Sequence, residues 1–422
     1  MLDGRAADLV AMRTDTCEAT RVRGEQSEAL LDLRMQCLDR WLGELRALTA
    51  LFVSRADPAL VDQSIPAAMA LPGLTRCADA EALAAAYPPP DDPTARAEVE
   101  ALRLRVDEIA ALELAGKHAE GLALAERVDE DAARVGWPPI HAQALFWLGA
   151  LQSRTGDAAA SVATFERALR RAAEARDDVL FLRAGAKRLY VIGYDLGRPD
   201  EALAMGALLD PLVTRAGDDP EIRADLFNRL GIVLWAKGAY AEAQGYLERA
   251  LPLFVQARGA DQPGVAAVEN NIANVLNDQG RVEEALLHYE KGLAISERTL
   301  GAAHPSSAAA RANVGTALKN LGRYPEAQAS LEAALAALTS AYGDHHITVA
   351  GAYNDLGNLH NLLGDHPRAL SYCERALEVA ATVLRPDHPF QGEFLLSQST
   401  VLLDLGRARE AIAPLERALA IL

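Results

Sequence analysis

From residue 221 to its end, the chain alternates apolar and polar positions with the period of an amphipathic α-helix. Apolar residues recur three and four positions apart, as in Ile272, Val275 and Leu276, which places them on one helix face. A glycine ends each first helix, because glycine adopts the left-handed conformation of a helix C-terminus without a steric clash. The pattern predicts pairs of helices, helix A and helix B, joined by a turn at that glycine.

The turn glycines recur at a fixed spacing. From Gly238 to Gly406 they lie 42 residues apart, four times over, and each is followed five residues later by an alanine. The spacing shortens to 41, 41 and 40 residues further toward the N-terminus, at Gly197, Gly156 and Gly116. We therefore expect eight helical hairpins over residues 94–422, with the strongest pattern over 221–422. A single hairpin cannot bury both of its faces, so stacked hairpins form a solenoid.

Residues 1–90 lack this period and are expected to form a separate helical segment. A long amphipathic helix is predicted over 25–55, a second helix begins at Asp57-Pro58, and a short one follows from Asp79 to Ala86. The proline-rich stretch 88–93 is typical of a linker. We expect this segment to be a cap or adaptor that covers the open end of the solenoid.

The repeat resembles the tetratricopeptide repeat, which carries Leu-Gly in helix A, Gly at the turn, Ala early in helix B and Ala-Leu late in it. Leu230-Gly231, Val314-Gly315 and Leu356-Gly357 fit the Leu-Gly position. The 42-residue length and the segment Gly301-Ala302-Ala303-His304-Pro305 are similar to the kinesin-light-chain variety. The resemblance implies an all-α fold: a right-handed superhelical α-solenoid of about eight helix-turn-helix repeats with an N-terminal helical cap.

A second resemblance covers roughly residues 10–85. The segments 17–20, 23–27 and 33–38 are similar to the region between the kinase domain and the repeats of large bacterial Ser/Thr kinases, myxobacterial ones especially. This chain has no Gly-rich loop, no His-Arg-Asp and no Asp-Phe-Gly. The resemblance implies an alternative function, the regulatory or sensor region of a bacterial Ser/Thr kinase whose catalytic domain is absent from this chain.

Charge and hydropathy exclude several classes of protein. Lys+Arg 42 against Asp+Glu 59 gives a net charge of −17, which argues against a general binder of nucleic acid or anionic membranes. No apolar stretch is long enough to span a bilayer, and the first residues lack a signal-peptide pattern. We expect a cytoplasmic protein, or one beyond a membrane anchor if it belongs to a transmembrane kinase.

The chain has four cysteines and no CxxC pair. Cys17, Cys37 and Cys77 lie in the first 80 residues. So few cysteines in so long a chain favour free, mostly buried thiols over a disulfide. The alternative is one N-terminal disulfide. The kinase resemblance, if it places the segment beyond a membrane anchor, implies a Cys37–Cys77 pair.

No motif for catalysis or cofactor binding is present. There is no P-loop, no Gly-x-Ser-x-Gly and no His-Glu-x-x-His, so we expect neither an enzyme nor a cofactor. His304, His346 and His388 recur 42 residues apart. Metal ligands lie about 2 Å from one ion, whereas stacked helical layers lie about 8–10 Å apart. These histidines are therefore expected to be turn and capping residues, with no metal.

Asparagine gives the strongest indication of a binding surface. Asn270, Asn274 and Asn277 lie at positions i, i+4 and i+7 of one helix A, and so share a face. Asparagine is a mediocre helix former, and an amide offers both a donor and an acceptor to the backbone of an extended peptide. Helix-A residues line the concave, peptide-binding groove of tetratricopeptide domains, so the resemblance implies that role here. The candidate groove residues are Asn270, Asn274, Asn277, Asn313, Lys319, Asn320, Asn354, Asn358 and Asn361.

Three interpretations of these amides remain open: a peptide groove, hydrogen bonds between helices, and simple exposure to water. The first predicts a scaffold that binds an extended peptide or protein segment. The apolar end at Ile421-Leu422 further predicts either a missing C-terminal helix or a homodimer through that end.

Overall fold

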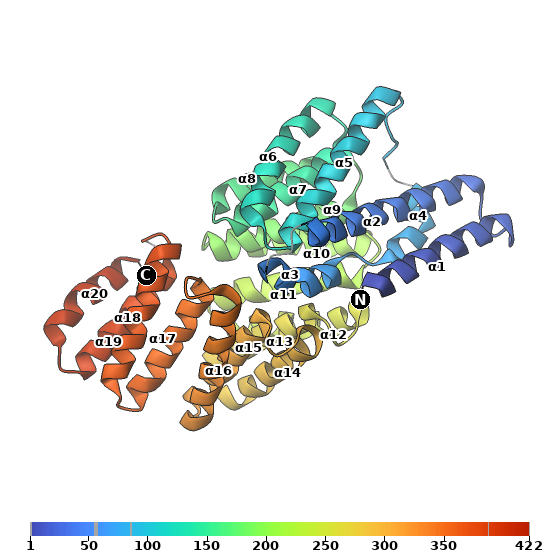
Figure 1. Ribbon diagram of the computed structural model, residues 1–422. Helices are drawn as coiled ribbons and strands as arrows, with labels where there is room; N and C mark the ends of the chain where they lie inside the picture. Colours follow the sequence, from blue (N-terminus) through green and yellow to red (C-terminus); the bar gives the residue numbers. More distant parts are fainter. Residues whose placement is uncertain (1, 55–57, 85–86, 387, 422) are drawn as a thin grey trace. The chain divides into compact units, whose positions relative to one another are not determined.

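The computed structural model describes residues 2–54, 58–84, 87–386 and 388–421. Three positions from the sequence analysis, Asp57, Ala86 and Leu422, lie outside these ranges. The described elements are all helical, which confirms the predicted all-α repeat fold (Figure 1). No described helix is both long and apolar enough to cross a bilayer.

The chain forms two compact units, Met1–Arg258 and Gly259–Leu422, called unit 1 and unit 2 below. The helices of unit 1 are α1 (Leu2–Arg21), α2 (Glu28–Ser54), α3 (Pro58–Ala70), η1 (Leu74–Ala78), α4 (Ala80–Ala84), α5 (Pro93–Leu114), α6 (His118–Val135), α7 (Pro138–Arg154), α8 (Ala158–Glu174), α9 (Asp178–Tyr190), η2 (Val191–Asp195), α10 (Pro199–Arg215), α11 (Pro220–Ala236) and α12 (Tyr240–Arg258). Those of unit 2 are α13 (Pro263–Asp278), α14 (Val282–Leu300), α15 (Pro305–Asn320), α16 (Tyr324–Tyr342), α17 (Ile347–Leu362), α18 (His366–Val383), α19 (Pro389–Asp404) and α20 (Ala408–Ile421). From α5 to α20 the helices pair into the eight predicted hairpins.

Each hairpin closes for the reasons that the sequence indicated. The turn glycines from Gly116 to Gly406 all have positive φ, between 63° and 89°, which a side chain would disfavour. The alanine five residues on is buried, as at Ala285 and Ala327. The helix-A glycine is needed too, because a Cβ on Gly315 would lie 2.7 Å from the Leu331 side chain of helix B. Small residues at both points let the two helices pack closely.

The repeated histidines begin helices. The Nδ1 atoms of His304, His346 and His388 accept hydrogen bonds from the backbone N–H two residues ahead, at 3.0, 3.3 and 3.2 Å. Each residue is the N-cap of a helix A in unit 2. An N-cap side chain satisfies a backbone donor that the helix cannot, so the predicted capping role is confirmed.

The N-terminal helices follow the sequence pattern in part. The helix predicted over 25–55 is α2, and its buried Leu38 and Leu48 pack with Ala111 and Leu112 of α5. Helix α1 was not predicted, because only Leu9, Thr16 and Ala19 of its residues are buried and no continuous apolar stripe marks it. The N-terminal helices therefore pack against the first helix of the array.

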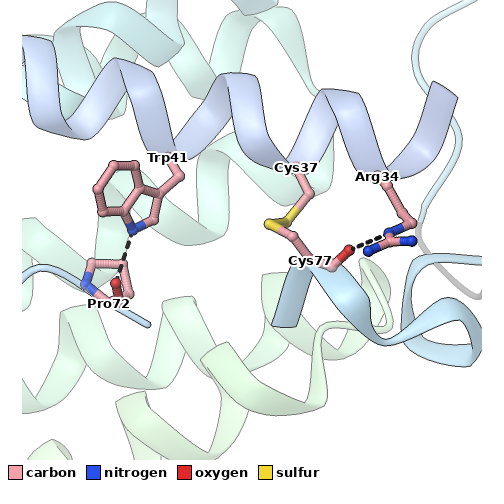
Figure 2. The surroundings of a disulfide bond; sticks show 5 residues. All are labelled: Arg34, Cys37, Trp41, Pro72 and Cys77. Atoms are coloured by element: carbon pink, nitrogen blue, oxygen red, sulfur yellow. Dashed lines mark hydrogen bonds between the residues drawn. A yellow bond between two sulfur atoms is a disulfide. The ribbon is translucent and has the colours of Figure 1, made fainter. Parts of the chain in front are cut away.

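The expectation of free thiols at Cys37 and Cys77 was wrong, because the structure joins them in a disulfide (Figure 2). Packing of η1 against α2 brings their Cα atoms to 5.5 Å, within the range that a disulfide bridges. Trp41 Nε1 donates to Pro72 O at 2.8 Å and Arg34 Nε donates to Cys77 O at 3.2 Å, so both ends of the segment are held to α2. Cys17 is free and exposed.

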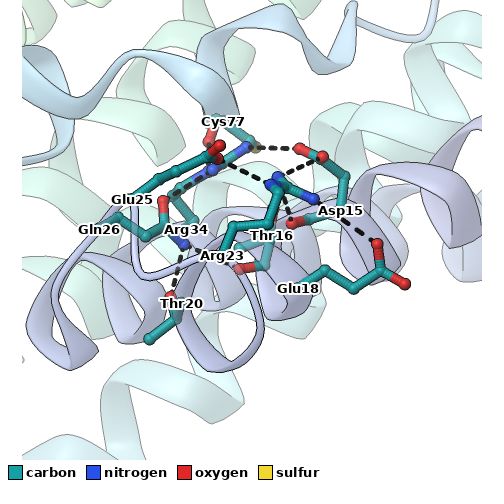
Figure 3. A network of polar contacts seen from close by, with 9 residues as sticks. All are labelled: Asp15, Thr16, Glu18, Thr20, Arg23, Glu25, Gln26, Arg34 and Cys77. Atoms are coloured by element: carbon teal, nitrogen blue, oxygen red, sulfur yellow. Dashed lines mark hydrogen bonds and ion pairs between the residues drawn. The ribbon is translucent and has the colours of Figure 1, made fainter.

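A polar network joins the α1–α2 turn to this disulfide (Figure 3). Arg23 pairs with Asp15 and Glu25, each at 2.8 Å. Gln26 donates to the Thr16 carbonyl at 2.8 Å and accepts from Arg34 at 2.8 Å. The segments that resemble the kinase-associated region therefore supply the residues that hold α1, α2 and η1 together.

Candidate functional site

The predicted asparagines lie on the A helices of unit 2, namely α13, α15 and α17. Each A helix buries its apolar residues against its own helix B, as Ile272, Val275 and Leu276 do in α13. The asparagines between these positions are half-buried, Asn320 alone being exposed. The local sequence therefore places a row of amides at the edge of the core, where part of each side chain remains accessible.

Three hydrogen bonds connect this row from one A helix to the next. Asn313 Nδ2 donates to Asn270 Oδ1 at 3.4 Å, and Asn320 Nδ2 donates to Asn277 Oδ1 at 3.1 Å. Asn361 Nδ2 donates to a carboxylate oxygen of α19, Asp404 Oδ2, at 2.6 Å. Each bond joins residues 43 positions apart. These bonds form an amide ladder, a term used below for Asn270, Asn277, Asn313, Asn320 and Asn361.

Asn274 and Asn354 differ from the ladder in their hydrogen bonds. Asn274 Oδ1 accepts a hydrogen bond from Tyr289 Oη of helix B at 2.6 Å. Burial, with a smaller contribution from Asp278, raises the pKa of Tyr289, so this hydroxyl remains a donor at neutral pH. Asn354 has a buried Oδ1 with no hydrogen-bond partner among the described residues. A buried acceptor without a donor costs about 1–3 kcal/mol, and the fold leaves this oxygen of Asn354 unused.

Charged groups accompany the amides on α15, α17 and α19. Burial raises the pKa of Asp355 to about 6, the positive charge of Lys319 opposes this shift, and Glu393 adds to it. Burial also raises the pKa of Glu393. Lys319 therefore lies close enough to Asp355 for its charge to act on that carboxyl group. At neutral pH this part of the surface carries both signs of charge beside neutral amides.

The arrangement offers hydrogen-bond donors and acceptors of the kind that a main chain can pair with. An amide that uses one donor or one acceptor within the ladder retains further hydrogen-bonding capacity. Alternating N–H and C=O groups of an extended segment match such a row without regard to the segment's sequence. The sequence did not indicate Tyr289, Asp355 or Asp404 as members of this surface, because each belongs to it only through contacts between helices.

Fold and surface define a helical-repeat protein with a row of amides along its A helices. Family profiles described as tetratricopeptide repeat match residues 222–298, 264–340, 306–371 and 348–422, and a further one matches 142–174. The chain belongs to the tetratricopeptide repeat proteins. Such repeats generally mediate interactions between proteins.

Two solved structures share the fold with TM-scores above 0.5. A Rap protein complexed with competence and sporulation factor is 16% identical, with a TM-score of 0.51 over 76% of this chain and 98% of that one. A signal transduction ATPase with a tetratricopeptide repeat sensor, from Pyrococcus horikoshii, is 13% identical, with a TM-score of 0.51 over 76% of this chain and 52% of that one. A putative kinesin light chain from Podosopora anserina is 24% identical, with a TM-score of 0.40 over 48% and 95%. No curated protein sequence matches the chain.

Proposed function

We propose that unit 2 binds an extended segment of a partner protein along its A helices. The observation that carries this proposal is Asn354, whose half-buried side chain has an Oδ1 without a donor. That oxygen is buried, so it accepts from a backbone N–H of a bound segment once the Asn354 side chain turns toward the surface. Asn274 and Asn358, on the same face of their helices, supply further amide groups beside it.

The ladder has a supporting role in this proposal. The pairs Asn270–Asn313 and Asn277–Asn320 join α13 to α15, and Asn361–Asp404 joins α17, which carries Asn354, to α19. A surface held in place before binding loses less conformational entropy when the partner docks. Ladder residues are therefore poor choices for a test of binding, because their loss also loosens the helices.

The test separates binding from stability. The full chain and the variant Asn274→Ala/Asn354→Ala/Asn358→Ala would each capture partners from lysate of the source organism. The matched control is Gln328→Ala, which removes an exposed amide that bonds Glu332 within helix B of the next hairpin. We expect one or more proteins to be recovered by the wild type and the control but not by the triple variant, with unchanged helicity by circular dichroism. Equal recovery by all three would contradict the proposal.

A stability measurement sharpens the same test. Asn354→Leu removes a buried acceptor without a partner, so we expect the free energy of unfolding to rise by about 1 kcal/mol while partner binding falls. Loss of stability in this variant would show that Asn354 has a structural partner. For a residue that serves binding and not the fold, we expect stability to rise and partner binding to fall.

We also propose, as a second candidate, a regulatory region that functions beyond a membrane. The observation that favours it is the Cys37–Cys77 disulfide, because disulfides persist mainly in oxidising compartments. Alkylation of intact cells with a maleimide polymer, followed by gel electrophoresis, measures the state of these thiols. Labelling of Cys17 in intact cells with protection of Cys37 and Cys77 supports this candidate, whereas labelling of Cys17 only after the cells are lysed contradicts it.

A further inference from the structure

A cavity of about 1040 Å³ lies in unit 1, far in sequence from the amides of unit 2. Its walls are α2, α5 and residues near the linker, and Trp137 lines one side. Trp137 Nε1 donates to Pro88 O at 3.1 Å, and the rings of Tyr87 and Trp137 meet edge to face at 6.4 Å. These contacts hold the linker against the repeats and keep the cavity open between them.

Much of the lining is apolar. Leu51 and Leu112 are buried beneath it, and the aromatic pair Tyr87–Trp137 forms one wall. Leu104 also lines the cavity and is 67% exposed. Apolar groups gathered in a concavity of this size are typical of sites for small molecules, which need only a few polar groups to orient the ligand.

The polar groups include two arginines that lack full pairing. Arg103 lies over the Trp137 ring, 5.9 Å from its centroid. Its Nε is buried without a hydrogen-bond partner, although Glu100 Oε1 lies 3.5 Å away. Arg40 makes no ion pair with any described residue, and burial together with the charges of Arg103 and Arg76 lowers its pKa.

Among the described residues no acid forms an ion pair with Arg40, although the charges of Asp177 and Glu100 partly oppose the fall in its pKa. Asp39 is paired with Arg13, outside the cavity. Burial raises the pKa of Asp107 to about 7, with a smaller contribution from Glu44, so about half of the Asp107 carboxyl groups are protonated at neutral pH. The lining holds four cations, Arg40, Arg46, Arg96 and Arg103, and four acids, Asp39, Glu100, Asp107 and Glu108. Because Asp39 is paired with Arg13 and the pKa of Asp107 is raised to about 7, the balance at neutral pH is slightly positive, in a chain whose net charge is −17.

We propose that this cavity binds an amphipathic carboxylate, with the carboxylate at Arg40 and Arg103 and the apolar body against Leu51, Leu104 and Trp137. A guanidinium donates two parallel hydrogen bonds to a carboxylate, and the added charge strengthens them. The ligand supplies the acceptor that Arg103 Nε lacks and the counter-charge that Arg40 lacks. The volume accommodates a drug-sized molecule, and both a fatty acid and the free C-terminus of a short apolar peptide have this chemistry.

Isothermal titration calorimetry of the full chain with decanoate tests the proposal. Decyltrimethylammonium, with equal chain length and opposite charge, is the control probe. We expect decanoate to bind and the cation to bind at least tenfold more weakly. Arg40→Gln should weaken decanoate at least tenfold, because a charge-assisted hydrogen bond is lost. The matched control Arg127→Gln changes the same charge at an exposed position of α6 outside the cavity and should leave the affinity unchanged.

A second variant keeps the result decisive. Ala50→Trp fills part of the cavity from α2 and should abolish decanoate binding while circular dichroism remains unchanged. No binding of decanoate by the wild type, or equal binding by Arg40→Gln and Ala50→Trp, would overturn the proposal. A short apolar peptide with a free or an amidated C-terminus distinguishes the sources. If only the peptide with the free C-terminus binds, the site is assigned to peptide termini. If decanoate binds and neither peptide does, the site is assigned to fatty acids.

Discussion

Removal of the Cys37–Cys77 disulfide is expected to destabilise unit 1 by about 4 kcal/mol. The bond joins residues separated by 40 positions. In the chain-entropy relation, closing a loop of about 40 residues lowers the entropy of the unfolded chain by an amount worth about 4 kcal/mol at 25 °C. The variant Cys37→Ala/Cys77→Ala should lose this contribution. Cys17→Ala is the matched control, because Cys17 is exposed and free.

Tryptophan fluorescence during urea denaturation measures this effect in the full chain. All four tryptophans lie in unit 1, at Trp41, Trp137, Trp147 and Trp235. With a denaturant slope of about 2 kcal/mol/M, the midpoint of the double variant should fall by about 2 M urea. Wild-type protein in reducing agent should show the same fall. A shift below about 0.5 M, or an equal shift in Cys17→Ala, would refute the reasoning.

Two further predictions concern unit 2, and far-UV circular dichroism in urea measures both. Gly315→Ala places a Cβ 2.7 Å from Leu331 and should lower the free energy of unfolding by about 1–3 kcal/mol. Gly351→Ala meets open space within its helix and should raise it by about 0.5–1 kcal/mol. Effects of the same sign would contradict the close contact between the helices. Burial raises the pKa of Asp355 to about 6, so the folded chain holds a proton that the unfolded chain releases near pH 4. Stability should therefore rise as the pH falls from about 7 to about 4. Asp355→Asn should exceed the wild type by about 1–2 kcal/mol at pH 8 and match it at pH 4, and a constant difference would argue against a titrating carboxyl group.

The repeats could be predicted because each hairpin carries its own local signals. A glycine such as Gly280 fixes the turn, Ala285 permits close packing, and His304 caps the next helix A. These signals act within a few residues and recur at a fixed spacing. A repeat with a weak pattern can therefore be located from the repeats on either side of it. Helix α1 lacks such signals, since it packs through only a few buried residues such as Leu9.

Contacts between distant segments could not be predicted in the same way. The disulfide depends on how η1 lies against α2, so the cysteine count alone gave the wrong expectation of free thiols. The Cys37–Cys77 pair itself is predicted only by the alternative that the kinase resemblance implies. The cavity combines Arg40 with Trp137, which lie about a hundred residues apart in the sequence. For the amides, the sequence predicted a shared helix face but not which of them pair across helices. Whether they bind a partner stays a prediction.

The amide ladder makes the order of the repeats matter. Its bonds join residues 43 positions apart, whereas the repeat period is 42. Recombination that removed one whole repeat would preserve the helical pattern, the turns and the caps. It would nevertheless place Leu362 opposite Asn277, where Asn320 now lies. Each hairpin can therefore fold in any place along the array, but its asparagines pair only with those of a particular neighbour. This limits how the array can gain or lose repeats by recombination.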